Sequence, residues 1–304
     1  MRGPATPTYA YLCLAGSMAL VGANVAVGKL IVAEIPVFVF SGLRFAVACS
    51  VLAPFALLAN RRDSHRLKWN DWRDLFLQSF FGVFLFTVLM LYGVTMTSAS
   101  SAGVIAGAIP AAIAILAWLL LGEHPSRRAL LGIVLAVLGV IALNLGGAVP
   151  HSAPSEAAGG PEALGMLLVG GAVISEALFT IFAKRGAATV PPMRMVFYVN
   201  LFGLILVAPF AIWSGLAFEP AAVSTSAWFL AFYYALTGSV ISFFLWYIGV
   251  KHVPAAQAGV FTAVLPLLAV SVSVIFLGET ISALLIFGML CVISAVLLVT
   301  TSKP

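Results

Sequence analysis

Charged residues are scarce in this sequence. Only 8% of its 304 residues are Asp, Glu, Lys or Arg, whereas about a quarter of the residues in soluble domains are charged. A chain with 62% hydrophobic residues cannot cover a globular surface with polar groups, so its expected solvent is lipid. The net charge of +5 does not indicate a nucleic-acid partner, because the basic residues lie in short clusters between apolar runs and form no basic face.

Cysteines and catalytic motifs are equally sparse. The three cysteines lie inside apolar runs without a disulfide framework or metal-ligand spacing, and no metal or other cofactor is predicted. The chain has no His-Glu-x-x-His zinc motif, no Gly-x-Ser-x-Gly elbow and no Walker motif. Its aspartates, Asp63, Asp71 and Asp74, surround one connection and offer no intramembrane catalytic pair. An intramembrane enzyme is therefore a distant alternative, and ATP is not expected to power the protein directly.

Apolar runs fill most of the chain. A helix needs about 20 apolar residues to cross a bilayer, and ten runs of about that length can be marked. They are residues 9–32, 36–59, 72–94, 99–121, 127–147, 162–184, 191–213, 226–250, 255–277 and 281–300. We expect an all-α integral membrane protein with ten transmembrane helices, the first of them retained rather than cleaved as a signal peptide.

The basic residues predict the orientation in the membrane. When ten helices are threaded alternately, every Lys and Arg except Lys29 and Arg44 falls on one side. The positive-inside rule assigns that side to the cytoplasm. Both termini are therefore expected in the cytoplasm, and the linker over residues 148–161 is expected on the opposite side.

The two halves of the chain repeat one another, at an offset of 155 residues early on and of 156 from the third helix onward. Matched positions include Lys29 with Lys184, Gly82 with Gly238, Pro110 with Pro266, and Leu-Gly-Glu at 121–123 with 277–279. Shared apolar composition explains such pairs poorly. The expected division is a first five-helix repeat over 1–147, a linker over 148–161 and a second repeat over 162–304. Because five is odd, the second repeat enters the membrane inverted, an architecture of secondary transporters.

The Gly…Pro…Leu-Gly-Glu…Gly pattern of the fourth and fifth helices, which recurs in the ninth and tenth, resembles the EamA domain of the drug/metabolite transporter superfamily. The resemblance covers nearly the whole chain, and within the superfamily the chain is most similar to the YddG-type aromatic amino acid exporters. It implies ten helices around a central cavity and export of amino acids or other metabolites across a bacterial inner membrane, with the linker in the periplasm. A multidrug exporter, or an exporter of another metabolite, is the alternative within the superfamily.

Polar residues inside the apolar runs are candidates for the transport site, because ionisable groups are costly in a bilayer. Glu176 could pair with a basic group, accept a substrate ammonium or carry a proton. Arg44 could form a structural ion pair or contact a substrate carboxylate, whereas Lys29 is expected to reach the outer interface. The predicted substrate-binding or cavity-lining residues are Asn24, Arg44, Tyr92, Glu176, Tyr198, Asn200, Tyr234, Trp246 and Gln257.

Two further pairs of residues occupy equivalent places in the repeats. Pro110 and Pro266 fall within apolar runs, where proline removes a hydrogen bond and kinks a helix. Their symmetric placement favours a gating role over one in packing alone. Glu123 and Glu279 lie at tight corners before a helix, where capping is the expected role and coupling is an alternative.

The intramembrane polar groups are enough for one zwitterion and too few for the phosphates of a nucleotide sugar, which attract several basic residues. An apolar, aromatic wall suits large apolar or aromatic side chains. The sequence and the resemblance together predict a secondary transporter that exports neutral and aromatic amino acids by alternating access around a central cavity. Its expected partners are the amino acid and the lipid bilayer. No filter-like loop indicates a channel, and the short loops are compatible with a monomer.

Overall fold

The structure is a computed structural model that describes residues 8–62, 67–146, 162–277 and 282–301. Within these ranges the chain is helical without β-strands, and ten helices are long and apolar enough to cross a membrane. The prediction of an all-α chain with ten transmembrane helices is therefore confirmed. The expected linker at 148–161 and Glu279 lie outside the described residues.

Six of the ten spans are single helices. They are α1 (Thr8–Val32), α2 (Val37–Arg62), α7 (Arg127–Gly146), α8 (Glu162–Thr189), α9 (Pro192–Gly215) and α14 (Ala283–Thr300).

The other four spans are built from shorter pieces. The third joins α3 (Trp69–Ser79), the π-helix η1 (Phe80–Leu85) and α4 (Phe86–Met96), and the fourth joins α5 (Ala99–Ala106) and α6 (Ile109–Leu121). The eighth joins α10 (Thr225–Tyr234), the π-helix η3 (Ala235–Ile241) and α11 (Ser242–His252), and the ninth joins α12 (Ala255–Phe261) and α13 (Val264–Leu277). A 3₁₀ helix, η2 (Pro220–Ala222), precedes α10.

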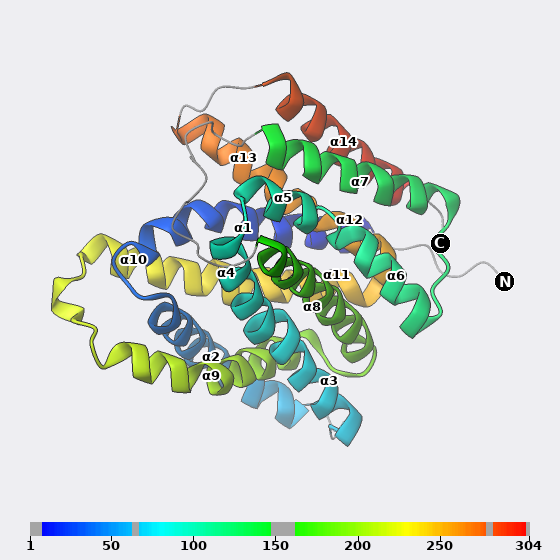
Figure 1. The fold of residues 1–304 in the computed structure, drawn as a ribbon. Coiled ribbons are helices and arrows are strands. Elements are labelled where there is room, and N and C mark those ends of the chain that lie inside the picture. The colour runs from blue at the N-terminus through cyan, green and yellow to red at the C-terminus, as the bar shows by residue number, and fades with distance from the viewer. Residues whose placement is uncertain (1–7, 63–66, 147–161, 278–281, 302–304) are drawn as a thin grey trace.

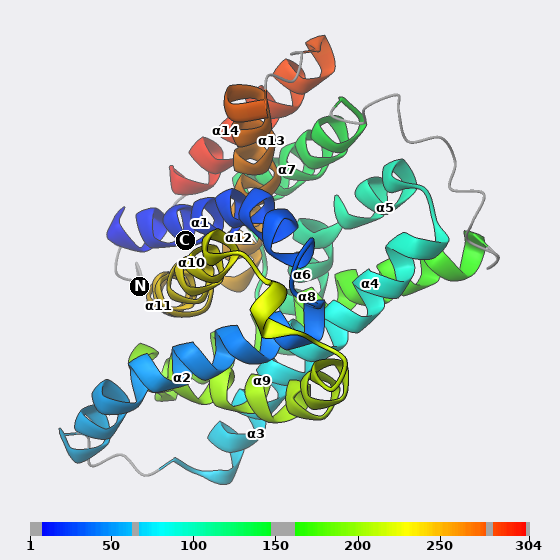
Figure 2. The ribbon, with the colours of Figure 1, turned by 90° about the vertical axis from the view of Figure 1, so that its left-hand side faces the viewer.

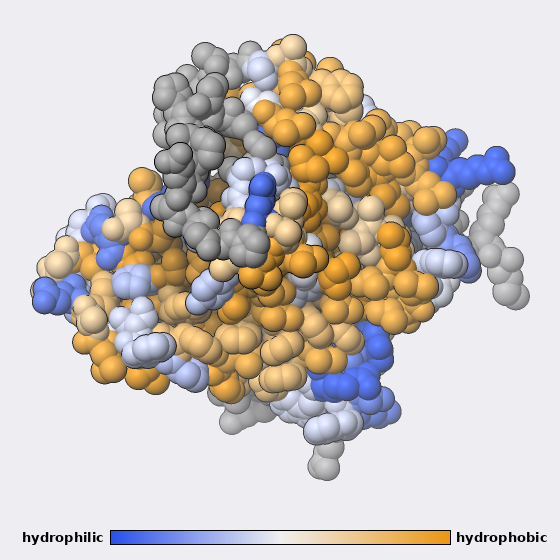
Figure 3. All heavy atoms as spheres, viewed as in Figure 1, coloured by the Kyte–Doolittle hydropathy of each residue, from blue (hydrophilic) through white to orange (hydrophobic). Residues whose placement is uncertain are grey.

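The exterior of the molecule is apolar. Hydrophobic residues cover most of the face drawn in Figure 3, and large side chains such as Leu167 and Ile212 are exposed. Water would make such a surface an aggregation liability. A hydrocarbon solvent accepts it, provided that backbone polar groups are bonded within the helices.

Equivalent helices of the two halves pack against each other at opposite ends of the molecule. Helix α2 lies along α9, and α7 lies along α14 (Figures 1 and 2). Glycines let the second pair approach closely, since a Cβ on Gly139 would come within 3.0 Å of the Gly288 carbonyl oxygen. The remaining spans lie between these two pairs and surround the centre of the molecule.

Candidate functional site

A cavity of about 480 Å³ lies among the central helices. This volume is in the range of small-molecule binding pockets. Its wall includes residues of α1, α4 and α6 from the first half and of α8, α11 and α13 from the second half. The cavity therefore lies between the two repeats, where inverted-repeat transporters hold their substrates.

Most of the cavity wall consists of positions that the repeat relates to one another. Six such pairs are Val21 with Glu176, Asn24 with Phe179, Gly82 with Gly238, Thr87 with Phe243, Met90 with Trp246, and Pro110 with Pro266. The glycines and prolines are the same in both halves, whereas the other pairs differ in chemistry. The two halves thus contribute largely equivalent positions to the cavity, whereas the polar groups at those positions differ.

Interrupted helices bring backbone to the cavity at four places. The π-helices η1 and η3 occupy equivalent positions, and each contributes a lining glycine, Gly82 or Gly238. The fourth span breaks between α5 and α6, and the ninth breaks between α12 and α13. Short π segments inside longer helices are frequent at functional sites, and broken helices are typical of transporter binding sites.

The two prolines, Pro110 and Pro266, lie at other positions in their helices than the sequence predicts. Pro110 is the second residue of α6, and Pro266 is the third residue of α13. Neither proline kinks a continuous helix, because each stands in the first turn after a break. Amide groups in a first turn have no intrahelical partner, so proline costs no hydrogen bond there. Both prolines line the cavity, and their gating role stays a prediction.

Arg44 of α2 contributes a cation to the cavity wall. Its Cζ lies 4.2 Å from the centroid of the Phe45 ring and 5.9 Å from that of Tyr234. The Nη1 atom donates a long hydrogen bond, 3.5 Å, to Ser239 Oγ. Within the described chain no acidic side chain pairs with Arg44. Aromatic faces stabilise a guanidinium but leave most of its five donors available to a ligand.

Glu176 contributes an anion from the other half of the molecule. It lies midway along α8, lines the cavity and is partly exposed there. Its carboxylate makes no hydrogen bond or ion pair with any described residue. Because a carboxylate at this depth is costly without a partner, it is suited to bind a positively charged group or a proton.

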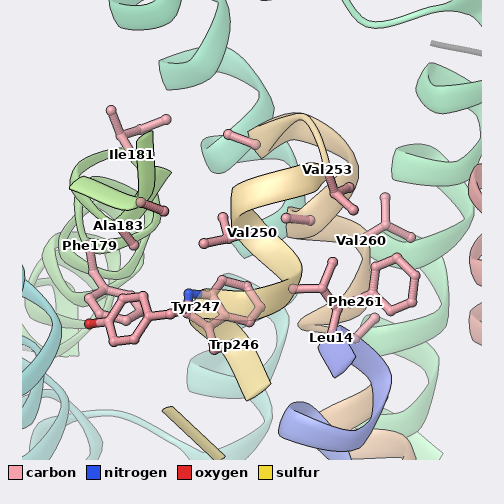
Figure 4. Packing of buried hydrophobic residues seen from close by; sticks show 14 of the residues in the cluster. Leu14, Phe179, Ile181, Ala183, Trp246, Tyr247, Val250, Val253, Val260 and Phe261 are labelled. Atoms are coloured by element: carbon pink, nitrogen blue, oxygen red, sulfur yellow. The ribbon is translucent and has the colours of Figure 1, made fainter. Parts of the chain in front are cut away.

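The remaining predicted residues of the cavity form its polar and aromatic wall. Asn24 is buried and donates a hydrogen bond from Nδ2 to Thr237 Oγ1 at 3.0 Å. Tyr234 packs edge-on against Phe40, with ring centroids 5.1 Å apart. Trp246 stacks on Phe179 at 6.4 Å (Figure 4), and its Nε1–H has no hydrogen-bond partner among the described residues.

Four predicted residues lie outside this cavity. Tyr92 is 54% exposed on α4, and Tyr198 packs edge-on against Trp72. Asn200 donates hydrogen bonds to the carbonyl oxygens of Val196 at 2.7 Å and Ser239 at 3.0 Å, and Gln257 accepts one from Tyr11 at 3.2 Å. The two amides hold helices together, because a buried polar group in lipid needs a protein partner.

Other residues that line the cavity were not among those predicted from the sequence. They include Thr87, Asn144, Phe179, Phe243 and Thr262. The repeat itself held a signal for Phe179, because it is the counterpart of Asn24. Asn144 carried the same signal as Asn24, an amide within an apolar run, and it donates hydrogen bonds to the carbonyl oxygens of Gly103 at 3.2 Å and Val140 at 2.9 Å.

Comparisons with known proteins agree with this architecture. The EamA-like transporter family matches the chain twice, over residues 8–145 and 163–301. The uncharacterized transporter YetK of Bacillus subtilis (strain 168) is 40% identical over 97% of this chain and 87% of its own length. YvbV of the same organism, also an uncharacterized transporter, is 26% identical over 96% of this chain and 92% of its own. A protein of known crystal structure has the same fold, with a TM-score of 0.75 and 19% identity over 95% of both chains.

Proposed function

The chain belongs to the EamA-like transporter family, and from this premise we propose that it exports neutral amino acids with large apolar or aromatic side chains. Transport follows alternating access around the central cavity, which opens to one side of the membrane at a time. The protein resides in a bacterial inner membrane with both termini in the cytoplasm, and its two five-helix repeats cover residues 1–147 and 162–304.

One observation carries the substrate proposal. The cavity holds a carboxylate, Glu176, and a guanidinium, Arg44, and neither has an oppositely charged partner among the described residues. Both charges are costly in a membrane protein unless an oppositely charged ligand pairs with them or water solvates them. A zwitterionic amino acid supplies an ammonium for the first and a carboxylate for the second, so it satisfies both groups in one binding event.

The rest of the wall supports an apolar side chain on that amino acid. Met18, Met90, Phe86, Phe243 and Trp246 line the cavity. Methionine and aromatic side chains gain from contact with a substrate ring. Such a surface discriminates weakly between similar apolar groups, so we expect several large neutral amino acids to be transported.

Transport by purified protein in liposomes tests the proposal. Labelled phenylalanine should be taken up, and unlabelled tryptophan, tyrosine, leucine and methionine should compete. Cells that overproduce the protein should tolerate toxic analogues of phenylalanine. If only nucleotide sugars competed, the substrate class would be wrong, although the family would stand.

A multidrug exporter is the second candidate, and a specific feature favours it. Glu176 lies near aromatic side chains such as Phe179, and that combination also suits a lipophilic cation. The two candidates differ in their need for Arg44. Arg44→Gln should weaken transport of a zwitterion, whereas a cation has no carboxylate for Arg44 to bind and should be transported at least as well.

A further inference from the structure

Lys184, near the end of α8, binds the end of another helix. Its Nζ donates hydrogen bonds to the carbonyl oxygens of Val250 at 2.9 Å, Lys251 at 3.2 Å and Val253 at 2.7 Å. All three donors of the ammonium are used. These carbonyl groups belong to the C-terminal turn of α11 and the residue after it, where acceptors lack intrahelical partners and a cation is favoured.

Glu123, just after α6, binds the other side of the same connection. Its Oε2 accepts a hydrogen bond from the amide of Ala256, in the first turn of α12, at 3.3 Å. Burial raises the pKa of the Glu123 carboxyl, and the Ala256 amide and the Lys184 ammonium oppose that rise. Helices α8 and α6 therefore hold the α11–α12 connection from both ends, through one cation and one anion.

The connection between α11 and α12 is buried as well as hydrogen-bonded. Val250, Val253 and Ala255 have no exposed surface. Phe179 of α8 stacks on Trp246 of α11 with ring centroids 6.4 Å apart, and Ala183 of α8 belongs to the same buried cluster as Tyr247 and Val250 of α11 (Figure 4). Helix α8 packs on α11, and α6 packs on α12. This closure lies on the side of the membrane predicted to face the cytoplasm.

In the first half of the chain, the equivalent residues and helices are not packed together in this way. Lys29, the counterpart of Lys184, is exposed and makes no hydrogen bond or ion pair with any described residue. Val94, the counterpart of the fully buried Val250, is 44% exposed. Helix α1 has no packing on α4 comparable to that of α8 on α11, and the pair α5 and α13 likewise lacks the packing of α12 on α6. The same set of parts is assembled on one side of the cavity and separated on the other.

We propose that Lys184 and Glu123 latch the cytoplasmic side of the cavity shut. In the opposite conformation, Lys29 binds the carbonyl oxygens of Val94, Thr95 and Thr97, the counterparts of Val250, Lys251 and Val253, and latches the outer side. The inference rests on the proposed alternating-access function and adds residues that act on the conformational equilibrium without touching the substrate. Because the two halves share one sequence pattern, the arrangement that one half adopts is available to the other.

Cysteine labelling measures this equilibrium directly. The reporters are Val253→Cys on the closed side and Val94→Cys on the open side, in a protein whose Cys13, Cys49 and Cys291 are replaced by alanine. A membrane-impermeant maleimide is applied to whole cells for the outer side and to inside-out vesicles for the cytoplasmic side. Lys184→Met should raise the labelling rate at residue 253 by about tenfold or more, because three charge-assisted hydrogen bonds are lost, and should lower the rate at residue 94.

Lys29→Met should shift both rates in the opposite directions. The matched control is Arg185→Met, which removes the neighbouring cation and its partly exposed ion pair with Asp74 and should leave both rates unchanged, because such pairs contribute little. If Lys184→Met leaves the rates as they are, or raises both, the latch is wrong. Should that variant fail to accumulate, Glu123→Gln, which keeps the side-chain shape, must produce the same shift to a smaller extent, and its absence refutes the latch equally.

The labelling assay uses no substrate, so the latch and the substrate proposal can fail separately. A shift in labelling without transport of phenylalanine would overturn only the substrate class. Transport of phenylalanine with labelling rates that do not respond to Lys184→Met would overturn only the latch.

Discussion

Single residues in and around the cavity fall into two groups according to where their hydrogen bonds go. Asn24 bonds to Thr237, and Asn200 and Gln257 bond within the protein. Arg44 has one long hydrogen bond, and Glu176 has none with a described residue. The first group stabilises the fold, because buried polar groups need partners in lipid. The second group has unused capacity, which is what binding a ligand requires.

The first prediction concerns the two charges. Glu176→Gln and Arg44→Gln should each raise the KM for phenylalanine by roughly 10- to 100-fold, because a hydrogen bond to a charged group contributes about 1.5–3 kcal/mol. Folding should be preserved, since neither side chain has an ion-pair partner among the described residues to leave behind. Initial rates of uptake into liposomes measure the change. The matched control is Glu162→Gln, at the exposed start of α8, which should leave the KM unchanged. An unchanged KM in both Glu176→Gln and Arg44→Gln would contradict the assignment.

The same Glu176 variant tests proton coupling. A carboxylate that takes up and releases a proton in the cycle makes the transport rate depend on pH, and glutamine cannot titrate. Glu176→Gln should therefore flatten the pH profile of uptake. A profile that keeps its wild-type shape would remove Glu176 as a proton carrier and leave its binding role standing.

The second prediction concerns Glu123 and acid. Burial raises the pKa of its carboxyl above its ordinary value, so the folded protein takes up a proton at a higher pH than the unfolded chain does. The contribution of Glu123 to the free energy of unfolding therefore increases as the pH falls through the raised value, down to the unfolded value of about 4.3. Thermal midpoints of wild type and Glu123→Gln between pH 7.5 and 5 measure it. The wild type should gain more on acidification, whereas Glu219→Gln, which is exposed, should behave like the wild type.

The sequence predicts the charged residues of the site better than its amides and aromatic residues. A charge within an apolar run is conspicuous, and Arg44 and Glu176 both line the cavity, whereas among the predicted amides Asn24 lines it and Asn200 and Gln257 do not. Aromatic side chains occur throughout the spans, and whether they face the cavity depends on the rotation of each helix. Tyr92 and Phe86 are both aromatic residues of α4, yet only Phe86 lines the cavity. Local sequence does not determine that rotation, because lipid accepts an aromatic ring as well as the cavity does.

At the scale of helices, four of the spans that line the cavity are interrupted beside it. The π-helices η1 and η3 and the two breaks before Pro110 and Pro266 all contribute residues to the cavity, whereas α1, α7 and α8 line it as continuous helices. Proline and glycine mark the breaks in the sequence. Each π-helix also contains a glycine, Gly82 or Gly238, but glycine alone does not predict a π-helix, because the extra residue depends on packing between helices rather than on local preference.

The third prediction tests the packing at η1. A Cβ on Gly82 would collide with the ring of Phe179, whereas a Cβ on Gly170 of α8 would meet no atom within 4 Å. Gly82→Ala should therefore lower the free energy of unfolding by about 1–3 kcal/mol and reduce transport. Gly170→Ala should change it by no more than about 1 kcal/mol, in the stabilising direction. Thermal midpoints of the detergent-solubilised proteins measure both, and equal effects would show that η1 does not need to approach α8 so closely.

At the scale of the whole molecule, the two halves are alike in the arrangement of their helices. They differ in the polar residues that they present to the cavity and in which side of the cavity is closed. Equivalent helices pair at both ends, and equivalent positions line the cavity. Yet Lys184 is bonded while Lys29 is exposed, and Glu176 faces the cavity where its counterpart is Val21. A sequence repeat predicts the symmetric arrangement of the helices. It cannot predict which side of the cavity is closed, because both halves contain the parts of the latch and only the folded conformation determines which set is assembled.

The fourth prediction concerns the sidedness of the whole molecule. When the ten spans are threaded alternately, every Lys and Arg except Lys29 and Arg44 falls on one side, and the positive-inside rule predicts that this side faces the cytoplasm. Alkaline phosphatase needs disulfides that form outside the cytoplasm, so a fusion after Gly146, at the end of the fifth span, should be active. A green fluorescent protein fused after Thr301 should fluoresce, because ten spans return the chain to the side where it began.

Neutralising the basic residues around the second connection should increase the fraction of inverted molecules. These residues are Arg61, Arg62, Arg66, Lys68 and Arg73. Fluorescence after Gly146 with phosphatase activity after Thr301 would show the opposite orientation and would place the closed side of the cavity outward.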